Sequence, residues 1–238
     1  MYTNYLLLLV ILSVAIFYSV KMNKLTPGGA IAGGVIGCCI FAGAFFTGIT
    51  MVGLFFLLGT LATSWKRDTK EKFGAAESNR GRRTAMQVIA NGGIAALAGL
   101  LSSLFPIHQQ IFQLAMASAL AAATADTLSS ELGMVYGKKF YNMLTFRSDR
   151  KGENGVVSLE GALIGVAGSA LIAMVYSIGF GWGPSFIWIV IAGTAGNIAD
   201  SLLGATLERK QYLTNDAVNL ANTLTGALSA LVLDRICR

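Results

Sequence analysis

Apolar residues fill eight long stretches of the chain, and polar residues gather mainly between them. Each stretch is close to the roughly 20 residues that an α-helix needs to cross the hydrocarbon core of a membrane. The pattern therefore predicts an all-α, polytopic integral membrane helical bundle with about seven or eight transmembrane helices. The predicted spans are 2–20, 27–47, 49–65, 85–105, 110–133, 157–180, 184–207 and 215–233.

The composition supports this interpretation. Hydrophobic residues make up 54% of the 238 residues, charged residues only 13%, and the mean hydropathy is +0.63. A soluble domain of this length needs more charge to cover its surface, so we expect a single integral membrane domain over residues 1–238. The first stretch is expected to be a span and not a cleaved signal, because it lacks a basic start and a small-residue cleavage site.

Basic residues lie in alternate connections. Sixteen of the eighteen Lys and Arg residues follow the first, third, fifth and seventh spans, many of them in loops at about 66–84 and 137–156. The positive-inside rule makes these connections cytoplasmic and puts the amino terminus outside, for a multi-pass protein of the cell inner membrane. We expect the loops to meet lipid or substrate phosphates and expect no nucleic-acid partner. Arg235 and Arg238 fall outside if all eight stretches cross; otherwise one stretch is re-entrant.

Carboxylates occur at unusual positions, near the cytoplasmic ends of two spans. Asp126 and Glu131 lie in "ADTLSSELG", and Asp200 and Glu208 lie in "ADSLLGATLE". An ionisable residue within a span costs about 2.5–3.5 kcal/mol on insertion scales and marks a functional site by default. Because neighbouring carboxylates repel one another, we expect a Mg²⁺ ion among these four, with Asp126, Glu131 and Asp200 as the catalytic residues.

Amide side chains add polar stripes to the same spans. Asn197 shares a helical stripe with the second acidic motif, Asn219 and Asn222 share one in the last span, and Asn91 lies in the fourth span. These amides either hydrogen-bond between helices or contact substrate. The segment "KGENGVVSLEG" precedes the sixth span, and a turn at Gly155 would offer backbone N–H groups to phosphate. The P-loop pattern does not occur in the chain.

The ordered motifs resemble a known membrane family. They are "KRDTKEKFG", "RRTAMQVIANGG", "ADTLSSELG", "KGENGVVSLEG", "GNIADSLLGATLE" and "NDAVNLANTLTGAL". Together they are similar to domain of unknown function ninety-two, a family that includes the phytyl-phosphate kinase of chloroplast tocopherol synthesis. The resemblance implies a CTP-dependent enzyme that phosphorylates an isoprenyl monophosphate. It also implies site residues in the two acidic motifs (Asp126, Glu131, Asp200), the basic loop (Lys66, Arg67, Lys72, Arg83) and the glycine-rich loop (Asn154, Gly155).

Two functions are compatible with this pattern. Phosphoryl transfer depends mainly on positioning and electrostatic stabilisation, which favours a Mg²⁺-dependent kinase that converts an isoprenyl monophosphate to its diphosphate at the cytoplasmic interface. Its partners would be a lipid phosphate, CTP and membrane lipids. The alternative is a secondary transporter or lipid flippase with a paired-carboxylate ion site between two repeats. Separation of Asp126 and Asp200 across the membrane would exclude a shared site.

Overall fold

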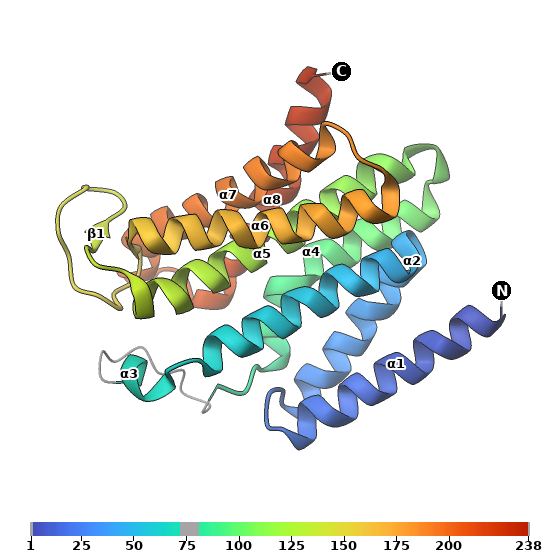
Figure 1. Ribbon diagram of the computed structural model, residues 1–238, viewed down its shortest axis with the longest axis horizontal. Coiled ribbons are helices and arrows are strands. Elements are labelled where there is room, and N and C mark those ends of the chain that lie inside the picture. Colours follow the sequence, from blue (N-terminus) through green and yellow to red (C-terminus); the bar gives the residue numbers. More distant parts are fainter. Residues whose placement is uncertain (1, 72–80, 238) are drawn as a thin grey trace.

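The computed structural model describes residues 2–71 and 81–237, and these are mostly helical (Figure 1). Within them, two short antiparallel strands pair in the loop before α6. This architecture confirms the predicted all-α membrane bundle. The elements are α1 (Tyr2–Lys21), α2 (Pro27–Ser64), α3 (Arg67–Glu71), α4 (Ala85–Leu104), η1 (Pro106–His108), α5 (Gln109–Tyr136), β1 (Tyr141–Asn142), β2 (Val156–Val157), α6 (Leu159–Phe180), α7 (Ser185–Leu203), η2 (Gly204–Glu208) and α8 (Asn215–Cys237).

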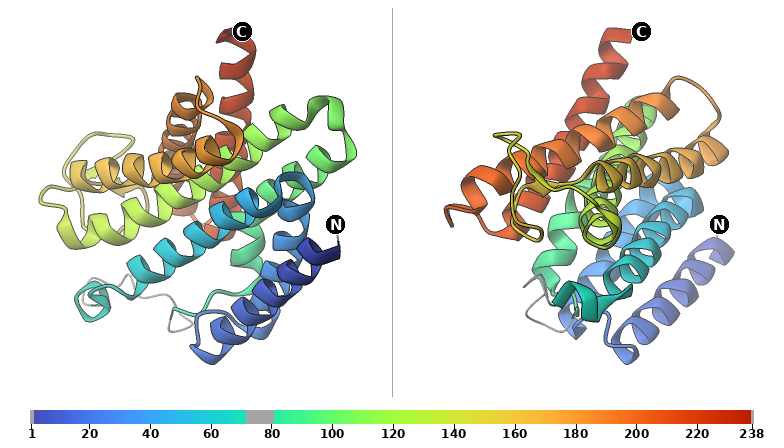
Figure 2. Two further views of the ribbon diagram at one scale, coloured as in Figure 1. Left: turned by 45° about the vertical axis from the view of Figure 1, so that its right-hand side comes forward. Right: turned by 60° about the vertical axis from the view of Figure 1, so that its left-hand side comes forward.

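The long helix α2 is folded back on itself into two arms. The backbone leaves the helical region at Phe45, where φ is 48° and ψ is −141°, and the chain then runs back alongside its first half (Figures 1 and 2). Gly29 in the first arm and Gly59 in the second both approach Arg83, which shows that the two ends of α2 lie together. The two arms correspond to the predicted spans 27–47 and 49–65, but the turn lies at Phe45, inside the first of these two ranges.

The crossings agree with the predicted number. Among the described residues, six helical segments are long and apolar enough to cross a membrane, and α2 contributes two arms to them. The less apolar α8 has 23 residues, and at about 1.5 Å per residue it extends about 35 Å, which is also enough to cross.

The two ends of the bundle carry different connections. In Figures 1 and 2, α3, β1 and the start of α8 lie at one end, and both termini lie at the other. Contacts join the basic connections: Lys24 Nζ donates to Ser64 Oγ at 2.8 Å, and Arg209 forms an ion pair with Asp149 at 2.8 Å. The described parts of the predicted cytoplasmic loops therefore share one end, which we call the basic end. Arg235, near the C-terminus, lies at the opposite end.

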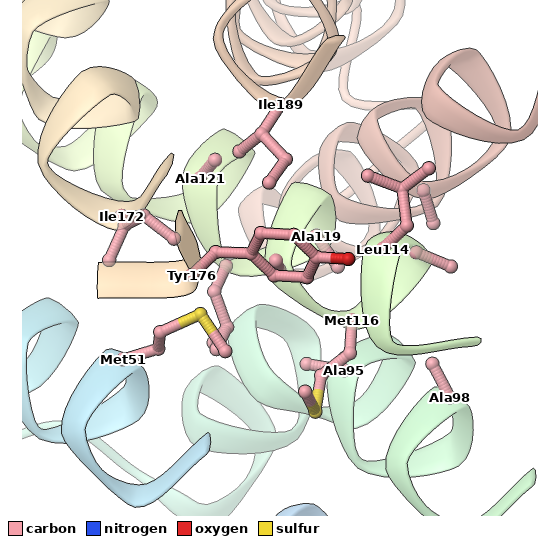
Figure 3. Close-up of a cluster of buried hydrophobic side chains, with 14 of the residues drawn as sticks. Met51, Ala95, Ala98, Leu114, Met116, Ala119, Ala121, Ile172, Tyr176 and Ile189 are labelled. Carbon is pink, nitrogen blue, oxygen red and sulfur yellow. The ribbon is translucent and has the colours of Figure 1, made fainter. Parts of the chain in front are cut away.

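Helix α5 forms the centre of the bundle. It packs against α2, α4, α6, α7 and α8, and an alanine-rich stretch, 113–125, is buried throughout. Small side chains here let neighbouring helices approach closely. Figure 3 shows Met116 and Ala119 of α5 packed near Tyr176 of α6 and Met51 of α2. The alanines thus build a rigid scaffold beneath the basic end.

Polar caps fix where the helices begin at the basic end. Thr84 and Gln87 form a reciprocal capping box at the start of α4, with hydrogen bonds of 2.8 Å and 3.3 Å. Ser158 caps α6 by accepting from the N–H of Gly161 at 3.1 Å. These caps satisfy backbone N–H groups that would otherwise lack partners, and they hold both helix starts next to the acidic motifs.

Candidate active site

Two aspartates from neighbouring helices meet near the basic end. Asp126 belongs to α5 and Asp200 to α7, and their carboxyl groups lie within hydrogen-bonding reach of each other. Three residues after Asp126, Ser129 donates from its Oγ to Oδ1 of Asn197 at 3.0 Å. Two adjacent carboxylates repel unless a proton or a cation lies between them. The acidic motifs thus form one centre, as a shared site requires.

A cavity of about 320 Å³ opens beside the aspartate pair. This volume lies within the range of small-molecule sites, about 300–1,000 Å³. Its walls come from α5, the start of α6, α7, η2, the start of α8 and the loop 152–158. The polar residues that line it are Asp126, Ser129, Ser130, Glu153, Asn154, Ser158, Asn197, Asp200, Ser201, Glu208 and Asn215. We call this space the acidic cavity.

The glycine-rich loop is held over the acidic cavity by Arg209. The Arg209 guanidinium donates from Nε to the carbonyl of Asn154 at 2.6 Å and pairs with Asp149 at 2.8 Å. Gly155, at a φ of +71°, lies directly against the backbone of Ala205. A side chain there would meet both an unfavourable φ and the neighbouring helix. The loop therefore keeps Asn154 and Gly155 in the cavity wall.

Asp149 anchors the other side of this loop. Its carboxylate accepts from the backbone N–H of Arg150 at 2.7 Å and from Asn142 Nδ2 at 3.2 Å. These two bonds and the Arg209 ion pair hold the pKa of the Asp149 carboxyl below its ordinary value. Asn142 also accepts two backbone N–H bonds within the loop, at 3.0 and 3.1 Å. The loop is therefore folded by its own polar contacts.

The segment η2 positions one more carboxylate. It is a π-helical stretch, in which the N–H of Arg209 donates to the carbonyl of Gly204 at 3.3 Å. Such stretches are rare and occur often at functional sites. Glu208, at the end of η2, lines the acidic cavity together with Asp200.

A second polar cavity, of about 120 Å³, is also lined by Asp126. Asp126, Ser130 and Asn215 line both spaces. The second space, which we call the amide cavity, is also lined by Thr63, Arg83, Gln87, Asn91, Thr127, Glu131 and Asn219. Asn91 donates to the Gln87 carbonyl at 2.9 Å, whereas its buried Oδ1 has no partner among the described residues. A buried acceptor of this kind needs water or a ligand.

Glu131 is not part of the aspartate pair. Its carboxylate binds Lys70 Nζ at 2.5 Å, and Lys70 also donates to the carbonyls of Ala62 and Thr63 at 2.9 Å. Among the residues described, no three His, Cys, Asp or Glu side chains are grouped so as to hold a metal ion. Of the four predicted ligands, Glu131 is instead paired with Lys70 from α3, and the Mg²⁺ site stays a prediction. Asp126 and Asp200, with Glu208 nearby, still suit Mg²⁺, which commonly uses one or two protein carboxylates.

Three of the predicted site residues that the structure describes line neither the acidic cavity nor the amide cavity. Lys66 is exposed and lies over the Tyr136 ring at 5.6 Å. Arg67 lines a pocket near Lys24 that shares Thr63 and Arg83 with the amide cavity. Asn222 is fully buried and donates to the carbonyl of Ala122, at 3.5 Å. Its buried Oδ1, like that of Asn91, has no partner among the described residues, so a role for Asn222 in substrate binding stays a prediction. Lys72 lies outside the described residues.

Some residues of the site have no counterpart in the sequence prediction. Ser129 lies one turn from Asp126, so helical spacing alone could have placed it on the same face. Lys70 and Arg209 are two of the basic residues that the sequence analysis uses only to predict topology. Their ion-pair partners come from elements distant in sequence, a relationship that helical periodicity does not contain.

Fold and site together define a polytopic membrane protein with a half-buried aspartate pair beside two polar cavities near its basic end. The chain belongs to the family described as Integral membrane protein DUF92, whose model matches residues 10–227. This bears out the resemblance drawn from the motifs.

Three relatives illustrate the family. The chain is 31% identical to Protein VTE6, chloroplastic, of Arabidopsis thaliana, over 90% of this chain but only 66% of that protein. It is 35% identical to Uncharacterized membrane protein MJ0933 of Methanocaldococcus jannaschii, over 90% of this chain and 87% of the relative. It is 33% identical to Uncharacterized membrane protein sll0875 of Synechocystis sp., over 87% of this chain and 81% of the relative. No solved structure matches the chain.

Proposed function

We propose that this protein is a membrane-embedded kinase that transfers a phosphoryl group from CTP to an isoprenyl monophosphate. The observation that carries the proposal is the position of Asp126, which lines both the acidic cavity and the amide cavity. A kinase whose acceptor is itself a phosphate must hold two phosphorylated substrates next to one reacting centre. Membership in a family that includes a phytyl-phosphate kinase supports the same assignment.

The two cavities are lined by different charged groups, as the binding of a nucleotide donor and a phosphate acceptor would require. The acidic cavity has the glycine-rich loop and the aspartate pair, which suits the triphosphate of a nucleotide with its metal ion. The amide cavity has Arg83, whose guanidinium suits the phosphate of the acceptor. We therefore assign the donor to the acidic cavity and the acceptor to the amide cavity.

The transfer step needs little from the protein beyond positioning and charge. An oxygen of the acceptor phosphate attacks the γ-phosphorus of CTP, a new P–O bond forms, and the bond to the β-phosphate breaks to release CDP. The acceptor oxygen is already anionic, so no general base is required. Asp126 and Asp200 would hold Mg²⁺, which supplies neutralising charge to the phosphates. Arg83 would orient the acceptor and stabilise negative charge.

The test uses purified protein in detergent with geranylgeranyl phosphate, CTP and Mg²⁺. We expect formation of geranylgeranyl diphosphate and CDP, and a loss of about 100-fold or more in kcat for Asp126→Asn and Asp200→Asn. Thermal melting of each variant checks that it is folded. The kinase assignment fails if the wild type forms no product and no nucleotide raises its melting temperature. Uptake of an ion or lipid by proteoliposomes under those conditions would then support the transporter.

A further inference from the structure

An apolar groove of about 170 Å³ lies between α1, both arms of α2, and α4. Its lining is apolar apart from four residues, and all four lie in the half of the groove nearest the basic end: Ser19, Arg83, Gln87 and Asn91. Its other end reaches Ile49, near the turn of α2, and Ile11 of α1. The groove thus has a polar entrance and an apolar interior, as a lipid with a charged head would require.

The groove continues into the amide cavity. Arg83, Gln87 and Asn91 line both spaces, and the amide cavity leads on to Asp126. Arg83 also packs its guanidinium over the Phe55 ring at 5.6 Å, inside the groove. A cation therefore lies where the apolar lining gives way to polar lining.

We infer that this groove holds the hydrocarbon chain of the acceptor, an inference that rests on the proposed function. The phosphate lies beside Arg83, which has the complementary charge, and the chain extends towards Ile49 among apolar side chains. Lateral entry from the bilayer is open, because α1 packs mainly against α2 and only Leu8 and Ser19 of its residues are buried. The depth of the groove then limits the length of chain that the enzyme accepts.

Gly53 offers a way to shorten the groove without disturbing the helix. It lines the groove, and a Cβ at this position would meet nothing within 4 Å. It lies six residues before Gly59, which touches the Arg83 guanidinium, and so about 9 Å deeper along the helix axis. A leucine at 53 would therefore occupy space that a long chain needs and a short chain does not reach.

The experiment measures kcat/KM for geranyl, farnesyl and geranylgeranyl phosphates. For Gly53→Leu we expect a loss of about tenfold or more with geranylgeranyl phosphate, because a few excluded methylene groups amount to that factor, and little change with geranyl phosphate. The matched control is Gly93→Leu on α4, where the nearest atom to a Cβ is Ile89 Cγ2 at 3.5 Å, outside the groove. An unchanged chain-length profile in a folded, active Gly53→Leu protein overturns the inference.

Photolabelling gives an answer that does not depend on activity or on the variant. A geranylgeranyl phosphate with a diazirine at its far end should label α1 or the second arm of α2 in the wild-type protein, and excess unlabelled compound should suppress this. Label confined to α6 or α7, or label displaced only by phospholipid, overturns the groove as the acceptor site. If the groove is labelled but no diphosphate forms with any nucleotide, the kinase assignment fails while lipid-phosphate binding at the groove is supported.

Discussion

Gly155 is the residue at which the glycine-rich loop comes closest to η2. In Gly155→Ala, a Cβ would overlap backbone atoms of Ala205 at a φ of +71°. We expect a loss of about 1–3 kcal/mol in the free energy of unfolding and weaker CTP binding, measured by thermal shift against CTP concentration. Gly181→Ala is the control, since Gly181 also has a positive φ but has nothing within 4 Å of a Cβ. Equal effects of both variants on CTP binding would contradict a role for the loop.

Among the residues that the structure describes, Lys70 forms an ion pair with Glu131, and both side chains are largely buried. Lys70→Met leaves the Glu131 carboxylate without this cation, and removing one member of a buried pair costs about 3–5 kcal/mol. We therefore expect a clearly lower melting temperature in detergent. The double variant Lys70→Met/Glu131→Gln should recover much of the loss, because no charge is then left unpaired. A double variant no more stable than Lys70→Met would show that the ion pair is not the cause.

At the scale of elements, the loop between α5 and α6 depends on Asp149. Because the folded pKa of this group lies below its unfolded value, its contribution is present above the unfolded pKa and is lost as the pH falls through the folded pKa. The ordinary value is 3.8, so the loop should resist limited proteolysis equally at pH 7 and pH 5. Asp149→Asn should be cut faster at both values. A wild-type loop that becomes sensitive between pH 7 and pH 5 would contradict this anchor.

The elements also show how far a sequence predicts such a bundle. The lengths of the apolar stretches predicted the membrane spans, because a helix that crosses lipid must be continuously hydrophobic. The turn of α2 at Phe45 was harder to place, since no glycine or proline stands at that position and a positive φ is unusual for phenylalanine. The pairing of Asp126 with Asp200 followed from two motifs at similar depth in helices that end on the same side.

Other contacts depend on how helices rotate against one another, which periodicity does not specify. Asn219 and Asn222 share a predicted stripe, yet Asn219 reaches the amide cavity while Asn222 packs against α5. The Lys70–Glu131 ion pair could be predicted only from the path of the chain after α2, because that path brings α3 next to α5. The tertiary structure determines this path.

For the whole molecule, the arrangement predicts that both termini face outward and all basic loops face the cytoplasm. Cys237 is exposed near the C-terminus, at the end of the bundle opposite β1, and it tests this directly. In intact cells a membrane-impermeant maleimide should label wild-type protein but not Cys237→Ser. Added to Cys237→Ser, Lys138→Cys in the cytoplasmic loop should be labelled only after the cells are permeabilised. The reverse pattern would invert the orientation and place the acidic cavity, the proposed CTP site, outside. A Cys237 labelled only after permeabilisation, with Lys138→Cys behaving in the same way, would mean that α8 does not cross. Both termini outside, with the acidic cavity facing the cytoplasm, is the arrangement that gives a kinase access to cellular CTP while its acceptor enters from the bilayer.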